Sequence, residues 1–352
     1  MPLAWRLLRY SLGKPKMDWA VNEAIFRSVR TGLTPNTLRL WQGSASVVLG
    51  SSSSFKDDIN HKNCRKHNVE IVRVNSVNPN IFYCDEGSLN FAFALNTSRI
   101  KQFITKSYQP VLSEYKLITE CIATGLQKKA EVAFRTNSSG VYLNDRILAE
   151  SVQVWFYDFL LFQGTIHVST NLKVYNQVIN SEKQLTTLSL EMGREIPVDD
   201  LIDPLVLATE EKLDVKFKEQ NITEDEEKLT QKLYRVKYSV DKWNIDGREP
   251  FLTGMGKTTV EVFVAYPPTS KCRQLIELIK DITSDLQGDV EVKVWMRGRG
   301  LHQHGPNPEI SPALRSAEKS NIIPAIIING ELKFSGSIPS RENLRKAIIE
   351  AL

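Results

Sequence analysis

The chain has 352 residues, of which 41% are hydrophobic and 24% charged, the balance of a soluble globular protein with two or three domains. Its 45 basic and 41 acidic residues leave a formal charge of +4, too small an excess to indicate a nucleic-acid partner. The longest apolar runs, such as 159–162, are too short to cross a bilayer, so no membrane association is expected.

The four cysteines lie far apart and form no CxxC pair: Cys64, Cys84, Cys121 and Cys272. Disulfide frameworks and zinc sites both need paired or clustered cysteines. This spacing therefore favours a reducing, cytoplasmic setting, and it predicts no metal site.

Residues 1–185 form the first predicted domain, in which short strands alternate with helices. Apolar residues at three- and four-residue spacing predict helices over 16–31, 57–68 and 98–123. Short β-branched and aromatic runs predict strands over 5–10, 38–41, 46–49, 70–74, 89–95, 132–134, 141–143, 147–154 and 159–167.

Residues 186–248 differ from the first domain in composition: they are charge-rich and have a helical pattern. Acidic residues open the helix that starts at Glu224, and basic residues follow towards its end, which suits the helix dipole. We expect a small helical accessory domain here, followed by a glycine-containing linker over 249–258.

Residues 259–352 form the third predicted domain. It has strands over 260–265, 291–296, 325–329 and 331–335, and helices over 270–287 and 340–352. Asn329-Gly330 between two strand-like runs is a strong hairpin signal.

This third domain resembles a thioredoxin-like domain. Ile323-Pro324, followed by AIIINGELKFSG, is similar to the strand and hairpin that follow the cis-proline of that fold, which implies a cis bond before Pro324. The redox-motif place holds TSKC, so only its second cysteine, Cys272, is present. Dithiol exchange needs two sulfurs and is not expected. Cys272 is either a thiol activated near a helix N-terminus or a buried structural thiol.

The most informative segment is 141–165, where two predicted strands meet at a tight Asn144-Asp145 turn. Several segments resemble, in order and spacing, those of the lipoate-protein ligase family, within the biotin/lipoate ligase fold: TLRLWQGSASVVLG (37–50), YCDEGSLNF (83–91), NDRILAESVQ (144–153), LLFQGT (160–165) and KYSVDKWN (237–244). The resemblance covers residues 5–245. It implies an α+β/α/β multidomain protein whose first domain is built on a mixed sheet.

The resemblance also implies a chemistry. Members of the family use ATP to convert lipoate to lipoyl-AMP, and then pass the acyl group to a lysine of a lipoyl carrier domain protein. A carboxylate and a phosphate must be held together, which requires positive charge and backbone N–H groups. The family supplies these with a glycine-rich loop and a hairpin lysine.

This chain departs from the family at those places. Ile147 stands at the lysine position, and the adjacent Arg146 is expected to point to the opposite face of the strand. The loop RVNSVNPNIF (73–82) contains no glycine, and its Pro79 lacks a backbone donor. The resemblance nevertheless implies ligand-binding candidates at Gly50, Arg73, Ser76, Asn78, Tyr83, Asp85, Asn90 and Ser151.

Three functions remain open at this point. The first is a catalytically degenerate family member that binds a lipoyl group or a lipoyl carrier protein. The second is an active ligase or acyltransferase that forms lipoyl-AMP and takes its cation from Arg73 or Arg146. The third is a non-catalytic interaction scaffold. Losing one preorganised donor costs roughly 3–4 kcal/mol of transition-state stabilisation, which favours the first. An open pocket beside Ile147 would distinguish the first function from the third.

Overall fold

The computed structural model describes residues 3–100, 110–138, 140–252, 255–284, 286, 289–298 and 310–352. Two compact units make up the chain, Met1–Arg248 and Glu249–Leu352. No helix in the described ranges is long and apolar enough to span a membrane.

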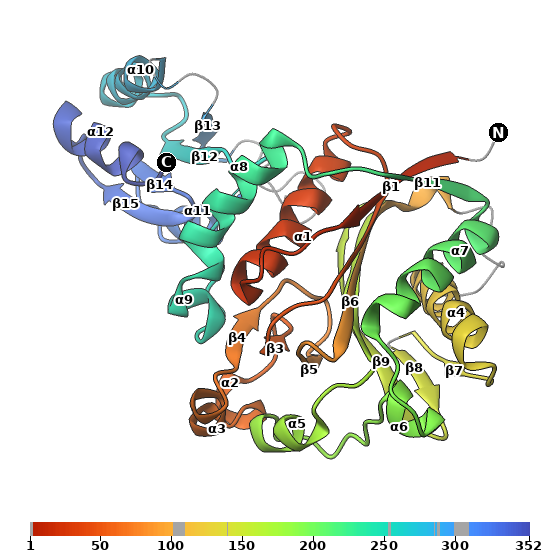
Figure 1. Ribbon diagram of the computed structural model, residues 1–352. Coiled ribbons are helices and arrows are strands. Elements are labelled where there is room, and N and C mark those ends of the chain that lie inside the picture. Colours follow the sequence, from red (N-terminus) through yellow and green to blue (C-terminus); the bar gives the residue numbers. More distant parts are fainter. Residues whose placement is uncertain are drawn as a thin grey trace. The chain divides into compact units, whose positions relative to one another are not determined.

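A mixed eight-stranded sheet forms the centre of the first unit, as predicted (Figure 1). In spatial order its strands are β11 (Val215–Glu219), β1 (Leu3–Arg9), β2 (Thr37–Trp41), β6 (Ser88–Asn96), β10 (Phe159–His167), β9 (Arg146–Phe156), β8 (Gly140–Leu143) and β7 (Arg135–Thr136). Strand β1 pairs in parallel with β11 and β2, and the other neighbours are antiparallel. The strand predicted over 132–134 is wrong, because pairing starts at Arg135.

Helix α1 (Pro15–Arg30) covers one face of this sheet, and α4 (Pro110–Ala130) and α7 (Ile202–Leu213) cover the other (Figure 1). The main core lies between the sheet and the α4–α7 pair. Gly125 permits that pair to approach closely, since a Cβ there would lie 2.7 Å from Leu205. Part of the helix predicted over 98–123, residues 101–109, lies outside the described residues.

A second, three-stranded sheet has the order β4 (Glu70–Arg73), β3 (Ser46–Leu49), β5 (Ile81–Cys84). It packs with α2 (Phe55–Asp58), α3 (His61–Lys66) and α5 (Leu172–Val178) around its own core. The single helix predicted over 57–68 is wrong. Ile59 instead forms a β-bridge with Ile179, and the Asn60 side chain caps a new helix.

Residues 186–248 belong to the first compact unit. They form α6 (Leu188–Met192), a 3₁₀ turn (Val198–Leu201), α7, β11, α8 (Glu224–Leu233), a π-helical segment (Tyr234–Tyr238) and α9 (Asp241–Asn244). Strand β11 extends the large sheet beside β1. The domain boundary expected after residue 185 stays a prediction.

The second unit has a four-stranded sheet in the order β13 (Val290–Met296), β12 (Thr258–Val264), β14 (Ala325–Ile328), β15 (Glu331–Ser335). Only the β12–β13 pair is parallel. Helices α10 (Ser270–Ser284) and α12 (Arg341–Ile349) enclose one core with the sheet, and α11 (Pro312–Lys319) encloses another. The Tyr266–Pro267 and Ile323–Pro324 bonds are cis.

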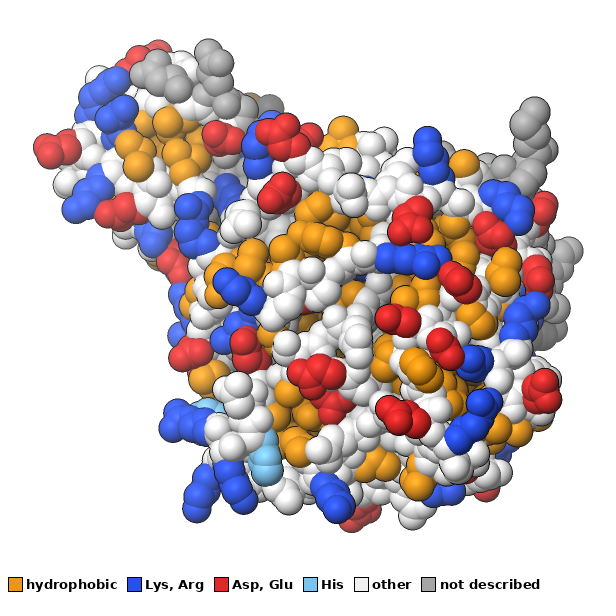
Figure 2. All heavy atoms as spheres, viewed as in Figure 1, with side chains coloured by type: hydrophobic (Ala, Val, Ile, Leu, Met, Phe, Trp, Pro, Cys, Tyr) orange, Lys and Arg blue, Asp and Glu red, His pale blue; other side chains and the backbone are white. Residues whose placement is uncertain are grey.

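Figure 2 shows one face of the molecule. Over the part formed by the first unit, basic, acidic and hydrophobic side chains are interspersed. This mixture agrees with the small net charge of the sequence.

A buried ion pair ties α8 to β1, and we predict that breaking it destabilises the first unit. The Arg6 guanidinium donates to both oxygens of Glu226 at 2.8 and 2.6 Å, and both residues are at most 1% exposed. Because Glu226→Gln leaves Arg6 as an uncompensated buried charge, it should cost about 3–5 kcal/mol of unfolding free energy. Urea unfolding followed by tryptophan fluorescence measures this, since five of the six tryptophans lie in the first unit.

Glu227→Gln, at an exposed position of the same helix, is the matched control and should change stability by less than about 0.5 kcal/mol. Equal stability of the Glu226 and Glu227 variants would contradict the assignment of this pair.

Candidate functional site

The hairpin of β8 and β9 forms as predicted. Asn144 and Asp145 both have positive φ, 49° and 64°, the conformation of a two-residue type I′ turn. The Arg146 guanidinium then lies 2.6 Å from a carboxylate oxygen of Glu191. Arg146 is therefore engaged with a carboxylate of its own chain.

Ile147 lines a cavity of about 250 Å³. The cavity wall consists of Asn78, Pro79, Asn80, Tyr142, Ile147, Ala149, Glu150 and Lys183. Phe82 and Ile81 are buried in β5, and Trp155 contacts Tyr115, so none of these three side chains fills the cavity. The space beside the hairpin is open.

The cation of this cavity is Lys183, which lies in the segment that runs beside the start of β9. The Ile147 N–H donates to Gln184 O at 2.8 Å, and this contact holds the segment against the hairpin. Sequence reasoning missed Lys183, because nothing in the residues around it distinguishes it from a surface lysine.

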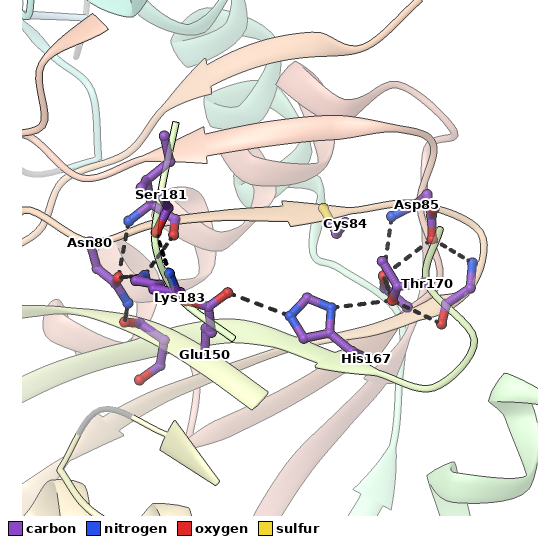
Figure 3. Close-up of polar contacts among 12 residues, drawn as sticks. Asn80, Cys84, Asp85, Glu150, His167, Thr170, Ser181 and Lys183 are labelled. Atoms are coloured by element: carbon purple, nitrogen blue, oxygen red, sulfur yellow. Dashed lines mark hydrogen bonds and ion pairs between the residues drawn. The ribbon is translucent and has the colours of Figure 1, made fainter. Parts of the chain in front are cut away.

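The Lys183 ammonium group donates to three acceptors, all from the protein (Figure 3). These are Asn80 Oδ1 at 2.6 Å, Ile81 O at 3.1 Å and Glu150 Oε1 at 2.7 Å. An ammonium group has three protons to donate. The hydrogen-bonding capacity of Lys183 is therefore fully used.

Glu150, on β9, is only 3% exposed. Burial alone raises the pKa of this carboxyl, but the polar contact with His167 and the charge of Lys183 outweigh burial and lower the pKa below its ordinary value. Glu150 is thus held ionised in the cavity wall.

A polar chain continues from Glu150 into the sheet (Figure 3). Glu150 Oε2 lies 3.5 Å from His167 Nε2, and His167 Nδ1 lies 3.2 Å from Thr170 Oγ1. The Thr170 hydroxyl is 2.8 Å from that of Ser88. All of these side chains are less than 5% exposed. The chain fixes the position of Glu150.

The loop 75–80 stands where the family resemblance expects a glycine-rich loop, and two of its backbone donors, the Ser76 and Val77 N–H groups, are used within the protein. Ser51 and Ser76 exchange hydrogen bonds, each backbone N–H donating to the other's Oγ at 2.9 Å. The Val77 N–H donates to Gln153 O at 2.8 Å. A Cβ on Gly50 would lie 2.5 Å from two atoms of this loop, so the loop packs directly on Gly50.

Arg73 does not line the cavity. It binds the serine turn after Gly50, residues 51–54. Its guanidinium is buried and donates to five backbone carbonyls, of Gly50, Ser51, Ser53, Trp243 and Ile245, at 2.9–3.3 Å. Burial lowers the pKa of Arg73, and the negative charge of Asp58 opposes this. The residue joins two segments of the chain that are far apart in sequence.

Of the eight binding candidates, Asn78 lines the cavity. The backbone carbonyl of Ser151 accepts from the Asn80 side chain at 2.8 Å and so supports the loop. Tyr83, Asp85 and Asn90 are buried and do not line the cavity. Asp85 accepts backbone N–H groups of the turns around it. The structure thus assigns most of the candidates to the framework around the cavity.

Cys84 and Cys272 are both buried. Burial raises the pKa of Cys84 to about 12. Burial also acts to raise the pKa of Cys272, but the Thr269 hydroxyl, which donates to its sulfur at 3.2 Å, and nearby backbone groups bring that pKa below the ordinary thiol value. Within the described residues no group of three or more His, Cys, Asp or Glu could hold a metal ion.

A second cavity, of about 130 Å³, lies between α1 and the β9–β10 pair. In its wall, Glu23 accepts from Arg27 at 2.6 Å, and from Lys237 and Tyr238 at 2.9 Å. Burial alone raises the pKa of Glu23, but Lys237 and Arg27 outweigh it and hold that pKa at about 2, below its ordinary 4.5.

Comparison with known proteins places these features in a family. Residues 14–210 match the family described as the lipoyl protein ligase A/B catalytic domain. Lipoate-protein ligase A subunit 1 of Thermoplasma acidophilum is 22% identical over 251 residues, covering 68% of this chain and 95% of the relative. Octanoyltransferase LipM of Clostridioides difficile is 23% identical over 273 residues, covering 68% and 98%.

Solved structures share the fold. A lipoate-protein ligase A bound with ATP matches 70% of this chain and all of its own, with a TM-score of 0.61 at 20% identity. A lipoate protein ligase from T. acidophilum with bound lipoic acid gives 0.59 at 21% identity, over 70% of this chain and all of its own. The family match ends at residue 210 and does not include the second unit.

We predict that Arg73→Lys destabilises the protein. A lysine keeps the charge but presents a single ammonium group, so several of the five carbonyls would lose their donor, at a cost of about 3–5 kcal/mol. Urea unfolding is the measurement, and Arg65→Lys, on the exposed face of α3, is the control with less than about 0.5 kcal/mol of change. Wild-type stability of Arg73→Lys would show that Arg73 is not a framework residue.

We also predict an acid-dependent contribution from Glu23. Because its pKa is lower in the folded state, its stabilising effect is complete above about pH 4.5 and is lost as the pH falls towards 2. The stability difference between wild type and Glu23→Gln should therefore shrink over this range in urea unfolding at stepped pH. A difference that stays constant from pH 7 to 2 would disprove the assigned shift.

Proposed function

The chain belongs to the lipoyl protein ligase A/B catalytic domain family, and on that premise we propose that it binds a lipoyl group, or a carrier protein bearing one, without efficient adenylation. The site is the cavity beside Ile147. In this proposal the ancestral pocket persists and the phosphate chemistry is lost.

The observation that carries this proposal is that Lys183 and two backbone N–H groups of loop 75–80 are already bonded within the protein. A transferring phosphate needs free cations and backbone N–H groups directed at its oxygens. Lys183 has all three of its protons donated to protein acceptors, and the Ser76 and Val77 N–H groups bond to Ser51 and Gln153. ATP would have to displace these hydrogen bonds before it could be bound productively.

Support for a lipoyl ligand comes from the cavity itself. It is open, and Pro79, Ile147 and Ala149 give it an apolar side, which suits an acyl chain. A fold relative from T. acidophilum carries bound lipoic acid, and another carries ATP. We propose lipoate-derived groups as ligands, with ATP or lipoyl-AMP as the cofactors of the alternative below.

A carrier protein is the proposed partner. A solved archaeal system contains a bipartite lipoate protein ligase and its E2 lipoyl domain, and this chain matches it with a TM-score of 0.60 at 19% identity. We propose a cytoplasmic encounter with such a lipoyl carrier domain, because the four cysteines are unpaired.

The alternative is an active ligase whose cation comes from Arg73 or Arg146. The geometry does not favour it. Arg73 is committed to backbone carbonyls, and Arg146 is paired with Glu191. A pure interaction scaffold is also disfavoured, because the space beside Ile147 is not filled by side chains.

For the second unit we propose a thioredoxin-like fold over residues 259–352, preceded by the linker 249–258. The strand order β13-β12-β14-β15, with one parallel pair and an antiparallel hairpin, supports it. In this proposal the second unit serves binding or thiol handling. The lipoate ligase-like domain at 1–185 and the accessory domain at 186–248 complete the proposed organisation.

We predict that lipoate-dependent ATP–pyrophosphate exchange stays at background for the full chain. Ile147→Lys should remain at background too, because a new lysine leaves the Ser76 and Val77 N–H groups committed. An active ligase of the family, assayed in parallel, serves as the positive control. Exchange above background, in wild type or in the variant, would contradict the loss of adenylation.

A lipoylated carrier domain should bind the full chain in native mass spectrometry. Ile147→Trp, which fills the cavity, should weaken this binding at least about tenfold, or 1.4 kcal/mol. Leu207→Trp, at a half-exposed position of α7, is the control and should bind like wild type. Absence of wild-type binding to both the lipoylated domain and free lipoyl ligands would refute the proposed function.

A further inference from the structure

We propose that the cavity beside Ile147 selects the amide-linked lipoyl group over free lipoate and lipoyl-AMP, and that Glu150 sets this selectivity. The inference rests on the proposed function, that a lipoyl group enters this cavity. Beyond that function, it assigns the amide-linked form as the ligand and Glu150 as the residue that discriminates between forms.

The charges in the cavity wall balance each other. Among the residues that line the cavity, one cation and one carboxylate are present, and Lys183 Nζ lies 2.7 Å from Glu150 Oε1. The pair leaves the wall without net charge. A ligand carboxylate or phosphate would add a second negative charge beside Glu150, which is buried and held ionised. Burying such a charge without a free cation is unfavourable.

The hydrogen-bond donors of Lys183 are already occupied. A carboxylate accepts hydrogen bonds and donates none. The donors of Lys183 are committed to Asn80, Ile81 and Glu150, so an anionic ligand would have to break one of these bonds. Glu150 therefore already occupies, from within the chain, the position at Lys183 that a ligand carboxylate would need.

An amide fits the remaining groups. It brings no charge, one N–H donor and one carbonyl acceptor. Asn78 Oδ1 is buried and has no hydrogen-bond partner among the described residues, so it can accept the N–H. The Tyr142 hydroxyl accepts from Asn137 Nδ2 at 2.9 Å, which leaves its own proton to donate to a carbonyl.

This choice of ligand gives the protein a place in a reaction sequence. An amide-linked lipoyl group arises when a lysine amine attacks the carbonyl of an activated lipoyl donor such as lipoyl-AMP: the amide C–N bond forms, the bond to AMP breaks, and the amine loses a proton. The ligand of this cavity is thus the product of lipoylation, and the chain would act after that step, upon a carrier that is already modified.

The test is isothermal titration calorimetry of the full chain with two probes, terminally blocked Nε-lipoyl-lysine and free lipoate. We expect wild type to bind the amide at least about tenfold more tightly, which corresponds to 1.4 kcal/mol. Glu150→Gln frees Lys183 from its carboxylate, so lipoate affinity should rise about tenfold while amide affinity changes less than about threefold. The double variant Glu150→Gln/Lys183→Met is the neutral control and should show no gain for lipoate.

Two outcomes overturn the inference, and they can be told apart. If wild type binds lipoate as tightly as the amide, or if folded Glu150→Gln gains nothing for lipoate, the selectivity is wrong while the proposed function stands. If wild type binds neither probe, the inference fails, and the proposed function fails with it only if the lipoylated carrier domain does not bind either. The wild-type comparison decides the question even if a variant does not fold.

Discussion

The rest of the site depends on the clamping of loop 75–80 between the serine turn after Gly50 and the β9 strand. Gly50 lets the loop approach closely, and the Val77 N–H bonds to β9 at Gln153. On the other side, Arg73 ties the serine turn to residues 243–245 by its bonds to carbonyls. The loop is thus bonded on both sides, and its Ser76 and Val77 N–H groups are directed at the protein instead of a ligand.

The charges of the cavity, like the backbone donors of the loop, are paired within the protein. Ile147 removes a cation from the hairpin, Lys183 brings one from another segment, and Glu150 neutralises it. Behind Glu150, His167 and Thr170 continue a buried polar chain that holds the carboxylate in position. Buried charges are tolerated when they are paired, so these residues form a unit whose members depend on one another.

Features that depend on residues close together in the chain could be predicted from the sequence. The Asn144-Asp145 turn and the strand 159–167 follow from turn chemistry and periodicity, whereas the mixed sheet was implied by the family resemblance, and Ile147 does line the open pocket. Strands β5 and β11 were not predicted, because one lies within an irregular loop and the other is charged at alternate positions. Lys183 could not be predicted, since its place in the cavity depends on long-range pairing of residue 184 with the hairpin.

Amide hydrogen exchange of loop 75–80 tests the central claim most directly, because it reports whether the backbone donors are committed. The account predicts that the Ser76 and Val77 amides of the free protein are protected at least about 100-fold, and that MgATP with lipoate leaves this protection unchanged. Exchange at the rate of an unstructured peptide, or protection that appears only with MgATP, would contradict the account by showing that the loop keeps its donors for a phosphate.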